Sequence, residues 1–85
     1  MTSQDIFAVV SESICEETRL PDIASISKTT TANEVPGWDS LAHVRIMLGI
    51  EMELDITIPI EDTYKADTVG DLVTLVTRFS KSASL

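Results

Sequence analysis

Apolar residues recur every three or four positions in the long stretches of this chain, and helix-breaking residues separate those stretches. Near the N-terminus, Ile6, Val10 and Ile14 have this spacing. The spacing matches the 3.6-residue turn of an α-helix and differs from the alternation typical of a half-buried strand. We therefore predict an all-α protein whose first helix begins at residue 2 or 3 and runs to about residue 17.

Two further stretches have the same helical period. The first covers residues 40–54, where the apolar arc is so wide that we expect the helix to be buried on more than one side. The other begins with Thr68 and Asp71 at the spacing of a capping box and runs to about Phe79. Residues 80–85 are expected to form a frayed tail.

The connections between these helices differ in length. Residues 18–38 form a long loop, and loops of this length are usually functional or well anchored. Residues 55–59 interrupt the helix, and 56–58 favour a strand by propensity, but a lone strand would have no partner. We therefore expect an ordered loop and then a short helical turn at 61–64. The segmentation gives a small four-helix bundle with a short third helix and a long first loop. The expected loop anchors are Leu20, Ile23, Ile26 and Val35.

The composition fits one small domain. With 85 residues, of which 44% are hydrophobic and 5% aromatic, the chain can form a single core of aliphatic side chains spanning 1–85, ordered over about 3–79. One cysteine excludes an internal disulfide. No run reaches the roughly 18 apolar residues of a membrane span, and the N-terminus lacks a signal segment, so we predict a cytoplasmic protein without membrane contact.

Acidic residues dominate the charge. The net charge is −8, which disfavours binding to nucleic acids and anionic membranes. Residues 34–67 hold eight acids and two bases, so most of the charge surrounds the second helix and the segment after it. We predict partner proteins with basic docking patches.

Ser40 lies where a turn gives way to the second helix. Pro36-Gly37 ends the preceding loop, and Asp39 can cap the helix with its side chain. The first turn of a helix has unpaired backbone N–H groups and the positive end of the macrodipole, which favour a phosphoryl group. An exposed Ser40 hydroxyl could therefore bear such a group, although Asp-Ser is also a common helix start without further function.

The residues around and after Ser40 resemble the acyl carrier protein family. The resemblance rests on an ordered series of matches across more than a third of the chain rather than on one short motif. The matching residues are Asp39-Ser40-Leu41, Val44, Ile46, Met47, Ile50-Glu51, Leu54, Ile58-Pro59 and Thr68-Val69.

This resemblance implies a four-helix bundle with a specific chemistry. A phosphopantetheinyl transferase would use coenzyme A and magnesium to attach 4′-phosphopantetheine to Ser40, between Asp39 and Leu41. The arm would then carry acyl or aminoacyl groups as thioesters between loading and processing enzymes. The chain would be a carrier and not an enzyme, and we expect it to be a monomer because it must visit several partners.

The resemblance also suggests a partner surface and a departure from the usual pattern. Carriers of fatty acid synthesis usually have acids where this chain has Ala42 and Arg45. We infer a specialised fatty acid, polyketide or related biosynthetic pathway rather than housekeeping fatty acid synthesis. The predicted partner-binding residues are Ala42, Val44, Arg45, Met47, Glu51 and Ile58.

Other functions are weaker alternatives. The string Trp38-Asp39-Ser40-Leu41 is similar to the motif of an esterase family, but the chain has a single histidine and no scaffold for an oxyanion hole. We expect that histidine, His43, at the surface beside the arm. No metal site is expected, because residues 55–60 lack the ligands of a calcium loop. An acidic helical interaction domain without the arm remains as an alternative from another class.

Two side chains could have either a structural or a functional role. Cys15 lies near the apolar face of the first helix and is expected to be a small core residue. Trp38 could stack on the arm or on a partner, or it could anchor the loop onto the core.

Overall fold

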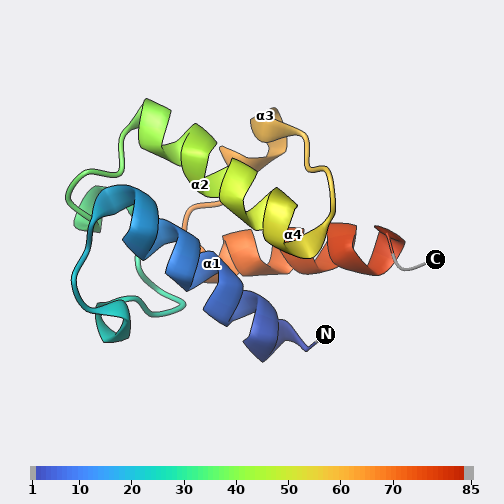
Figure 1. Ribbon diagram of the computed structural model, residues 1–85, viewed down its shortest axis with the longest axis horizontal. Coiled ribbons are helices and arrows are strands. Elements are labelled where there is room, and N and C mark those ends of the chain that lie inside the picture. The colour runs from blue at the N-terminus through green and yellow to red at the C-terminus, as the bar shows by residue number, and fades with distance from the viewer. Residues whose placement is uncertain (1, 84–85) are drawn as a thin grey trace.

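The fold is an all-helical bundle in the computed structural model, which describes residues 2–83 (Figure 1). Within that range α1 packs against both α2 and α4, and the long loop lies at the end of the bundle where α1 ends and α2 begins. No helix in this part of the chain is long and apolar enough to span a lipid bilayer. The elements are α1 (Ser3–Thr18), η1 (Ile23–Ser25), η2 (Ala32–Glu34), α2 (Ser40–Leu54), α3 (Ile60–Thr63) and α4 (Val69–Ala83). The predicted four-helix bundle with a short third helix is confirmed.

The core is aliphatic and lies between the three long helices. Ile6, Val10 and Ile14 are each at most 1% exposed, which confirms the apolar face predicted for α1. Burial of each such side chain contributes roughly 1.5–3 kcal/mol to folding. The other buried members of the core are Ile26, Val35, Ile46, Met47, Ile50, Ile56, Ile58, Val69, Leu72, Val73 and Val76.

The helix ends follow the capping signals in the sequence. Thr2 and Asp5 form a capping box at the start of α1, with both hydrogen bonds at 3.1 Å. At the start of α4 the backbone N–H of Asp71 donates to Thr68 Oγ1 at 3.1 Å. Helix α4 extends past the predicted end at about Phe79 and includes residues 80–83, whereas fraying of the tail 80–85 stays a prediction. That segment contains neither proline nor glycine to end the helix. Residues 84 and 85 lie outside the described range.

Helix α2 differs from the prediction. Its buried residues form one stripe, and Leu41, Leu48 and Met52 remain 59%, 52% and 82% exposed. The expectation of burial on more than one side is therefore wrong. The reason is that α1 covers one face of α2, whereas α3 has only four residues and is too short to cover the outer face.

The long loop is fastened to the core at several points. Ile26 and Val35 are both 5% exposed and Leu20 packs against the core, as predicted. Ile23 is not an anchor, because it lies in η1, which buries none of its residues. The loop is therefore held by three of the four predicted residues.

The same loop is also hydrogen-bonded to the start of α4. The backbone N–H of Val69 donates to the carbonyl of Thr30, and that of Gly70 donates to the carbonyl of Lys28, each at 2.8 Å. A Cβ atom at Gly70 would lie 2.9 Å from the Lys28 carbonyl oxygen. Glycine at this position therefore permits the close approach of the loop to the helix.

The segment between α2 and α3 is an ordered loop without a strand, as predicted. Asp55 ends α2 in the left-handed conformation with φ 55°. The backbone N–H of Ile56 donates to the Glu51 carbonyl at 3.1 Å, and that of Ile58 donates to a Glu51 carboxylate oxygen at 2.8 Å. These bonds hold the loop against the end of α2 and direct the chain into α3.

Candidate functional site

The turn before α2 determines where Ser40 lies. The backbone N–H of Trp38 donates to the Val35 carbonyl at 3.2 Å, and Gly37 has φ 89°. Proline followed by a residue with positive φ is the pattern of a type II turn, which favours glycine at the second position. The turn leads directly into the first residue of α2.

Asp39 caps α2, as predicted. Its backbone is extended, and its Oδ1 atom accepts a hydrogen bond from the Ala42 backbone N–H at 2.8 Å. The carboxylate also lies at the positive end of the helix dipole, where negative charge is stabilising. Ser40 follows as the first residue of the helix and is exposed to solvent. Its hydroxyl is therefore accessible to a modifying enzyme.

A pocket of about 330 Å³ lies beside Ser40. Trp38 and Asp39 contribute from the turn, His43 from α2, and Tyr64 from the end of α3. The start of α4 completes the pocket with Val69 and Leu72, which also belong to the core. The pocket therefore connects the exposed Ser40 with the apolar interior.

His43 is buried in the wall of this pocket. The prediction of a surface residue is wrong, because only 8% of His43 is exposed and both ring nitrogens are hydrogen-bonded. Trp38 Nε1 donates to His43 Nδ1 at 3.1 Å, and His43 Nε2 lies 2.7 Å from Thr63 Oγ1. Burial lowers the pKa of His43. A ring with both nitrogens occupied is not available as a base for Ser40, which removes the main support for a hydrolase.

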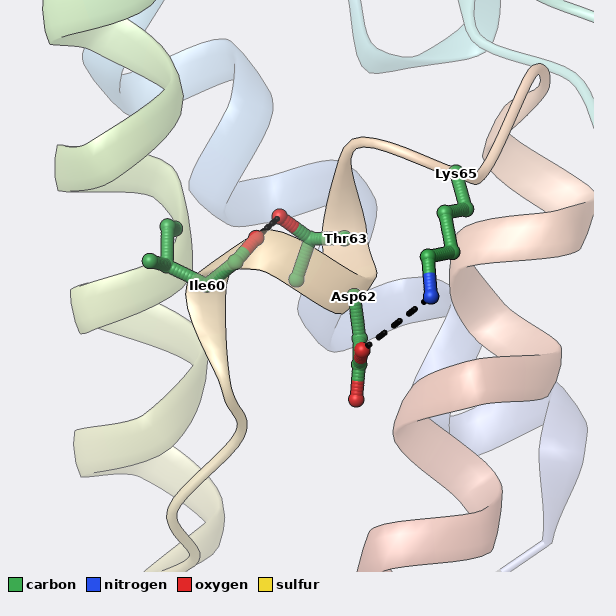
Figure 2. A network of polar contacts seen from close by, with 4 residues as sticks. All are labelled: Ile60, Asp62, Thr63 and Lys65. Atoms are coloured by element: carbon green, nitrogen blue, oxygen red, sulfur yellow. Dashed lines mark hydrogen bonds and ion pairs between the residues drawn. The ribbon is translucent and has the colours of Figure 1, made fainter.

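The hydrogen-bond partners determine which nitrogen of His43 carries the proton. An indole N–H can only donate, so Nδ1 must accept from Trp38. Thr63 Oγ1 donates its own proton to the carbonyl of Ile60 at 2.6 Å, as Figure 2 shows. His43 Nε2 therefore carries the proton and donates to Thr63 Oγ1. The result is a directed chain of hydrogen bonds from Trp38 through His43 to α3.

The aromatic rings at the site are also stacked. The rings of Trp38 and His43 are nearly parallel, with an interplanar angle of 18° and centroids 6.0 Å apart. The ring of Tyr64 also contacts His43 in a tilted arrangement, with centroids 4.7 Å apart and an interplanar angle of 30°. Trp38 also packs against the core, which supports its role as an anchor of the loop.

Helix α3 is short and held by local contacts (Figure 2). Thr63 is 2% exposed and bonds to Ile60 one turn earlier. Lys65 and Asp62 form an ion pair at 3.7 Å (Figure 2), and because the Lys65 side chain is 80% exposed, solvent leaves the pair little net strength. Thr63 is thus the residue that links α3 to α2 through its side chain.

The predicted partner-binding residues lie in three different environments. Ala42, Met47 and Ile58 are 5%, 2% and 5% exposed, so they belong to the interior of the protein. Glu51 is half-buried and its carboxylate accepts the hydrogen bond from Ile58. Of the six, only Val44 and Arg45 are exposed, and Val44 is 38% exposed.

Sequence reasoning missed the division of α2 into two faces. The buried residues Ala42, His43, Ile46, Met47 and Ile50 form one stripe, and Leu41, Val44, Leu48 and Met52 form another. Both stripes have helical spacing, so periodicity alone did not indicate which one faces the core. The polar His43 in the first stripe would have favoured the second stripe as the buried one, so the sequence held no local signal for this division.

Cys15 has the structural role predicted for it. It is half-buried and packs against the core. Burial raises the pKa of its thiol, which reduces its reactivity at neutral pH.

Comparison with known proteins agrees with this geometry. Residues 8–76 match the family model of the phosphopantetheine attachment site. The chain is 33% identical over 76 residues to an acyl carrier protein of Exiguobacterium sp. (strain ATCC BAA-1283 / AT1b), which covers 89% of this chain and 95% of that protein. The chain belongs to the acyl carrier protein family of phosphopantetheine-bearing carriers.

Membership of this family establishes the general role of the protein. It is a carrier rather than a catalyst, and it bears covalently attached 4′-phosphopantetheine. Its partners include a phosphopantetheinyl transferase and enzymes that handle acyl groups. The family therefore favours the carrier over the unmodified interaction domain.

Proposed function

We propose that Ser40 is the residue that bears 4′-phosphopantetheine. The observation that carries this proposal is the position of Ser40: an exposed hydroxyl on the first turn of α2, directly after the capping Asp39 and beside the pocket. The helix dipole at this position stabilises the negative charge of a phosphodiester. The site also lies within the matched region 8–76.

The residues around Ser40 fit such a group. The free side of the first turn of α2 is open to solvent, so an attached chain has space to extend. Trp38 and Tyr64 offer apolar ring surface within the adjacent pocket. When bound, the arm supplies a terminal thiol that holds the cargo as a thioester. The protein itself supplies the anchor, the favourable dipole and the neighbouring pocket.

A mass measurement tests the attachment site. The apo protein is incubated with coenzyme A, magnesium and a broad-specificity phosphopantetheinyl transferase, and its intact mass is recorded. We expect the wild type to gain one phosphopantetheine group and Ser40→Ala to gain none. Ser80→Ala is a matched control with a serine on a different helix, and it should be modified like the wild type. Equal modification of Ser40→Ala would contradict the proposal and move the site elsewhere.

We further propose that partner enzymes dock on the outer face of α2. This face consists of Leu41, Val44, Arg45, Leu48 and Met52, all exposed. Leu41 and Val44 lie within one turn of Ser40, so a partner that reaches the arm must approach them. An apolar face with a single cation differs from the basic-patch recognition predicted from the net charge. This outer face favours partners whose docking surface is largely apolar near Ser40. Basic residues of the partner would then meet only the acids farther along the chain.

The pathway and the cargo remain sequence-based predictions. Arg45 and Ala42 at positions where fatty acid carriers usually have acids support a specialised fatty acid, polyketide or related pathway. The cargo is an acyl group or, alternatively, an aminoacyl group. Incubating the protein that bears the unloaded arm with candidate loading enzymes and recording the mass of the product distinguishes the two kinds of cargo. A cytoplasmic location and a monomeric state are predictions of the same kind.

A further inference from the structure

His43 connects two segments that line the pocket beside Ser40. One wall is the turn that holds Trp38, two residues before Ser40, and the other is the end of α3 with Thr63 and Tyr64. His43 binds Trp38 with one ring nitrogen and Thr63 with the other, at 3.1 and 2.7 Å. Among the backbone hydrogen bonds of the described residues, none joins Trp38 directly to α3. The imidazole is therefore the hydrogen-bonded link between the two walls.

This link requires the neutral form of the ring. Neutral His43 accepts at Nδ1 and donates at Nε2, which matches the donor Trp38 and the acceptor Thr63. In the protonated form both nitrogens donate, so Nδ1–H would face Trp38 Nε1–H with two hydrogens between them. The bond to Trp38 is then lost, and a buried cation lacks a counter-ion within its hydrogen-bond partners. Protonation thus breaks the side of the bridge that is nearer to Ser40.

The charged and polar side chains that line the pocket determine where a protonated His43 ring would move. Asp39 from the turn and Asp67 from the segment before α4 are the charged residues that line the pocket, and Tyr64 adds a phenol from α3. The lining residues of α4, Val69 and Leu72, are apolar. Both carboxylates are exposed, so they can stabilise an imidazolium only after it has moved toward the pocket opening.

We propose that His43 is a positioning residue of the arm-bearing site: as neutral imidazole it holds Trp38 and α3 together as the walls of the pocket beside Ser40, and as imidazolium it releases Trp38 and opens that pocket. The proposal builds on the proposed function only in taking Ser40 as the attachment point. Its consequence is that the surroundings of the arm, and the shelter they give to a carried group, depend on the protonation of one side chain.

The test uses the single tryptophan of the chain as the reporter. Quenching of Trp38 fluorescence by acrylamide is measured on the apo protein as a function of pH, from about pH 8 to pH 4.5, the range in which histidine titrates. We expect the quenching constant to rise about twofold or more in one transition with a midpoint below the ordinary histidine value of about 6.5. Since burial lowers the pKa of His43, the opening should occur at mildly acidic pH.

Three variants separate positioning from a merely structural role. His43→Gln keeps an amide that can bridge the walls but cannot titrate, so its quenching constant should not change over the transition. Thr63→Val removes the acceptor and should raise the quenching constant at neutral pH, whereas Thr63→Ser keeps the hydroxyl and should behave like the wild type. Circular dichroism of each variant establishes that it is folded.

Two results would overturn the proposal. One is a flat pH profile of the wild type, and the other is a transition that persists in His43→Gln. Neither result depends on the arm, because the protein is in its apo form. A flat profile together with normal mass gain at Ser40 rejects the positioning role alone, whereas absent mass gain with a normal transition rejects the attachment site alone.

Discussion

Helices α2 and α4 are both 15 residues long, but they use their apolar residues differently. Leu72 and Val76 of α4 are 2% and 0% exposed and face the core. In α2, Leu41, Leu48 and Met52 are more than half exposed even though the helix also buries a full stripe. Helix α4 has the apolar residues that folding requires, and α2 has additional ones on its outer face. This difference supports the proposed docking of partners on the outer face of α2.

The largest expected effect is a difference in the free energy of unfolding between variants on the two faces of α2. Ile50→Ala should lower the free energy of unfolding by about 3 kcal/mol, because it removes a fully buried side chain from the core. Leu48→Ala, on the same helix but 52% exposed, should change it by less than about 0.5 kcal/mol. Urea unfolding followed by far-UV circular dichroism measures both. Similar losses in the two variants would show that the outer face contributes to folding after all.

The second prediction tests the outer face by function. Leu41→Ala should raise the KM of the phosphopantetheinyl transferase for the carrier about tenfold, equivalent to about 1.4 kcal/mol of binding, with little change in stability. Leu41 is 59% exposed and directly follows Ser40. Met52→Ala, at the far end of α2, is the control and should leave KM nearly unchanged. An equal rise in both variants would argue against docking near Ser40.

A third prediction concerns the contact between α1 and α2. Ser13 Oγ donates to the Ile46 carbonyl at 2.8 Å. A Cβ atom at Gly49 would lie 2.8 Å from this Ser13 Oγ atom. Gly49→Ala therefore disturbs this bond, although alanine by itself favours the helix by about 1 kcal/mol. We expect a coupling of about 1 kcal/mol in a double-mutant cycle with Ser13→Ala, in which Gly49→Ala is more favourable. Additive effects of the two substitutions would contradict a direct clash.

The smallest expected effect is the dependence of stability on pH through His43, a titratable side chain on the buried stripe of α2. Because burial lowers the pKa of His43 in the folded protein, the unfolded chain binds the proton more tightly. The part of the free energy of unfolding that depends on neutral His43 is fully present above about pH 6.5. It is lost as the pH falls toward the lowered pKa of the folded protein. Chemical unfolding at several pH values should show this loss in the wild type and not in His43→Gln.

A second group titrates outside that window. The backbone N–H of Thr2 lowers the pKa of Asp5 from its ordinary value of 3.8. The stability that this carboxylate contributes is present above that value and is lost only at lower pH. Loss of stability near pH 6 in His43→Gln would therefore have to come from another group and would contradict the assignment.

The sequence predicted the helices well, because their signals are local. The capping residues Thr2, Asp39 and Thr68 and the turn at 36–37 determine where helices start, and each could be recognised from neighbouring residues. The end of α4 was predicted less accurately, since no breaker follows Phe79 and a polar tail gives no clear stop signal. Local chemistry therefore determined the beginnings of helices better than their ends.

The site was only partly predictable. Ser40 and the cap at Asp39 follow from the order of residues along the chain. The burial of His43 depends on Trp38, five residues earlier, and on Thr63, twenty residues later, and neither pairing has a local signal. Likewise, the inward position of Met47 and Ile58 depends on how α1 and the 55–59 loop pack. Contacts between distant segments therefore account for the wrong prediction of His43.

The hydrogen bonds between the first loop and α4 have a consequence for the order of assembly. The carbonyls of Lys28 and Thr30 are bound by the amides of Gly70 and Val69, about forty residues later. During synthesis on the ribosome, the loop is translated before these partners. The two hydrogen bonds that hold the loop against α4 can therefore form only after the beginning of the last helix has been made.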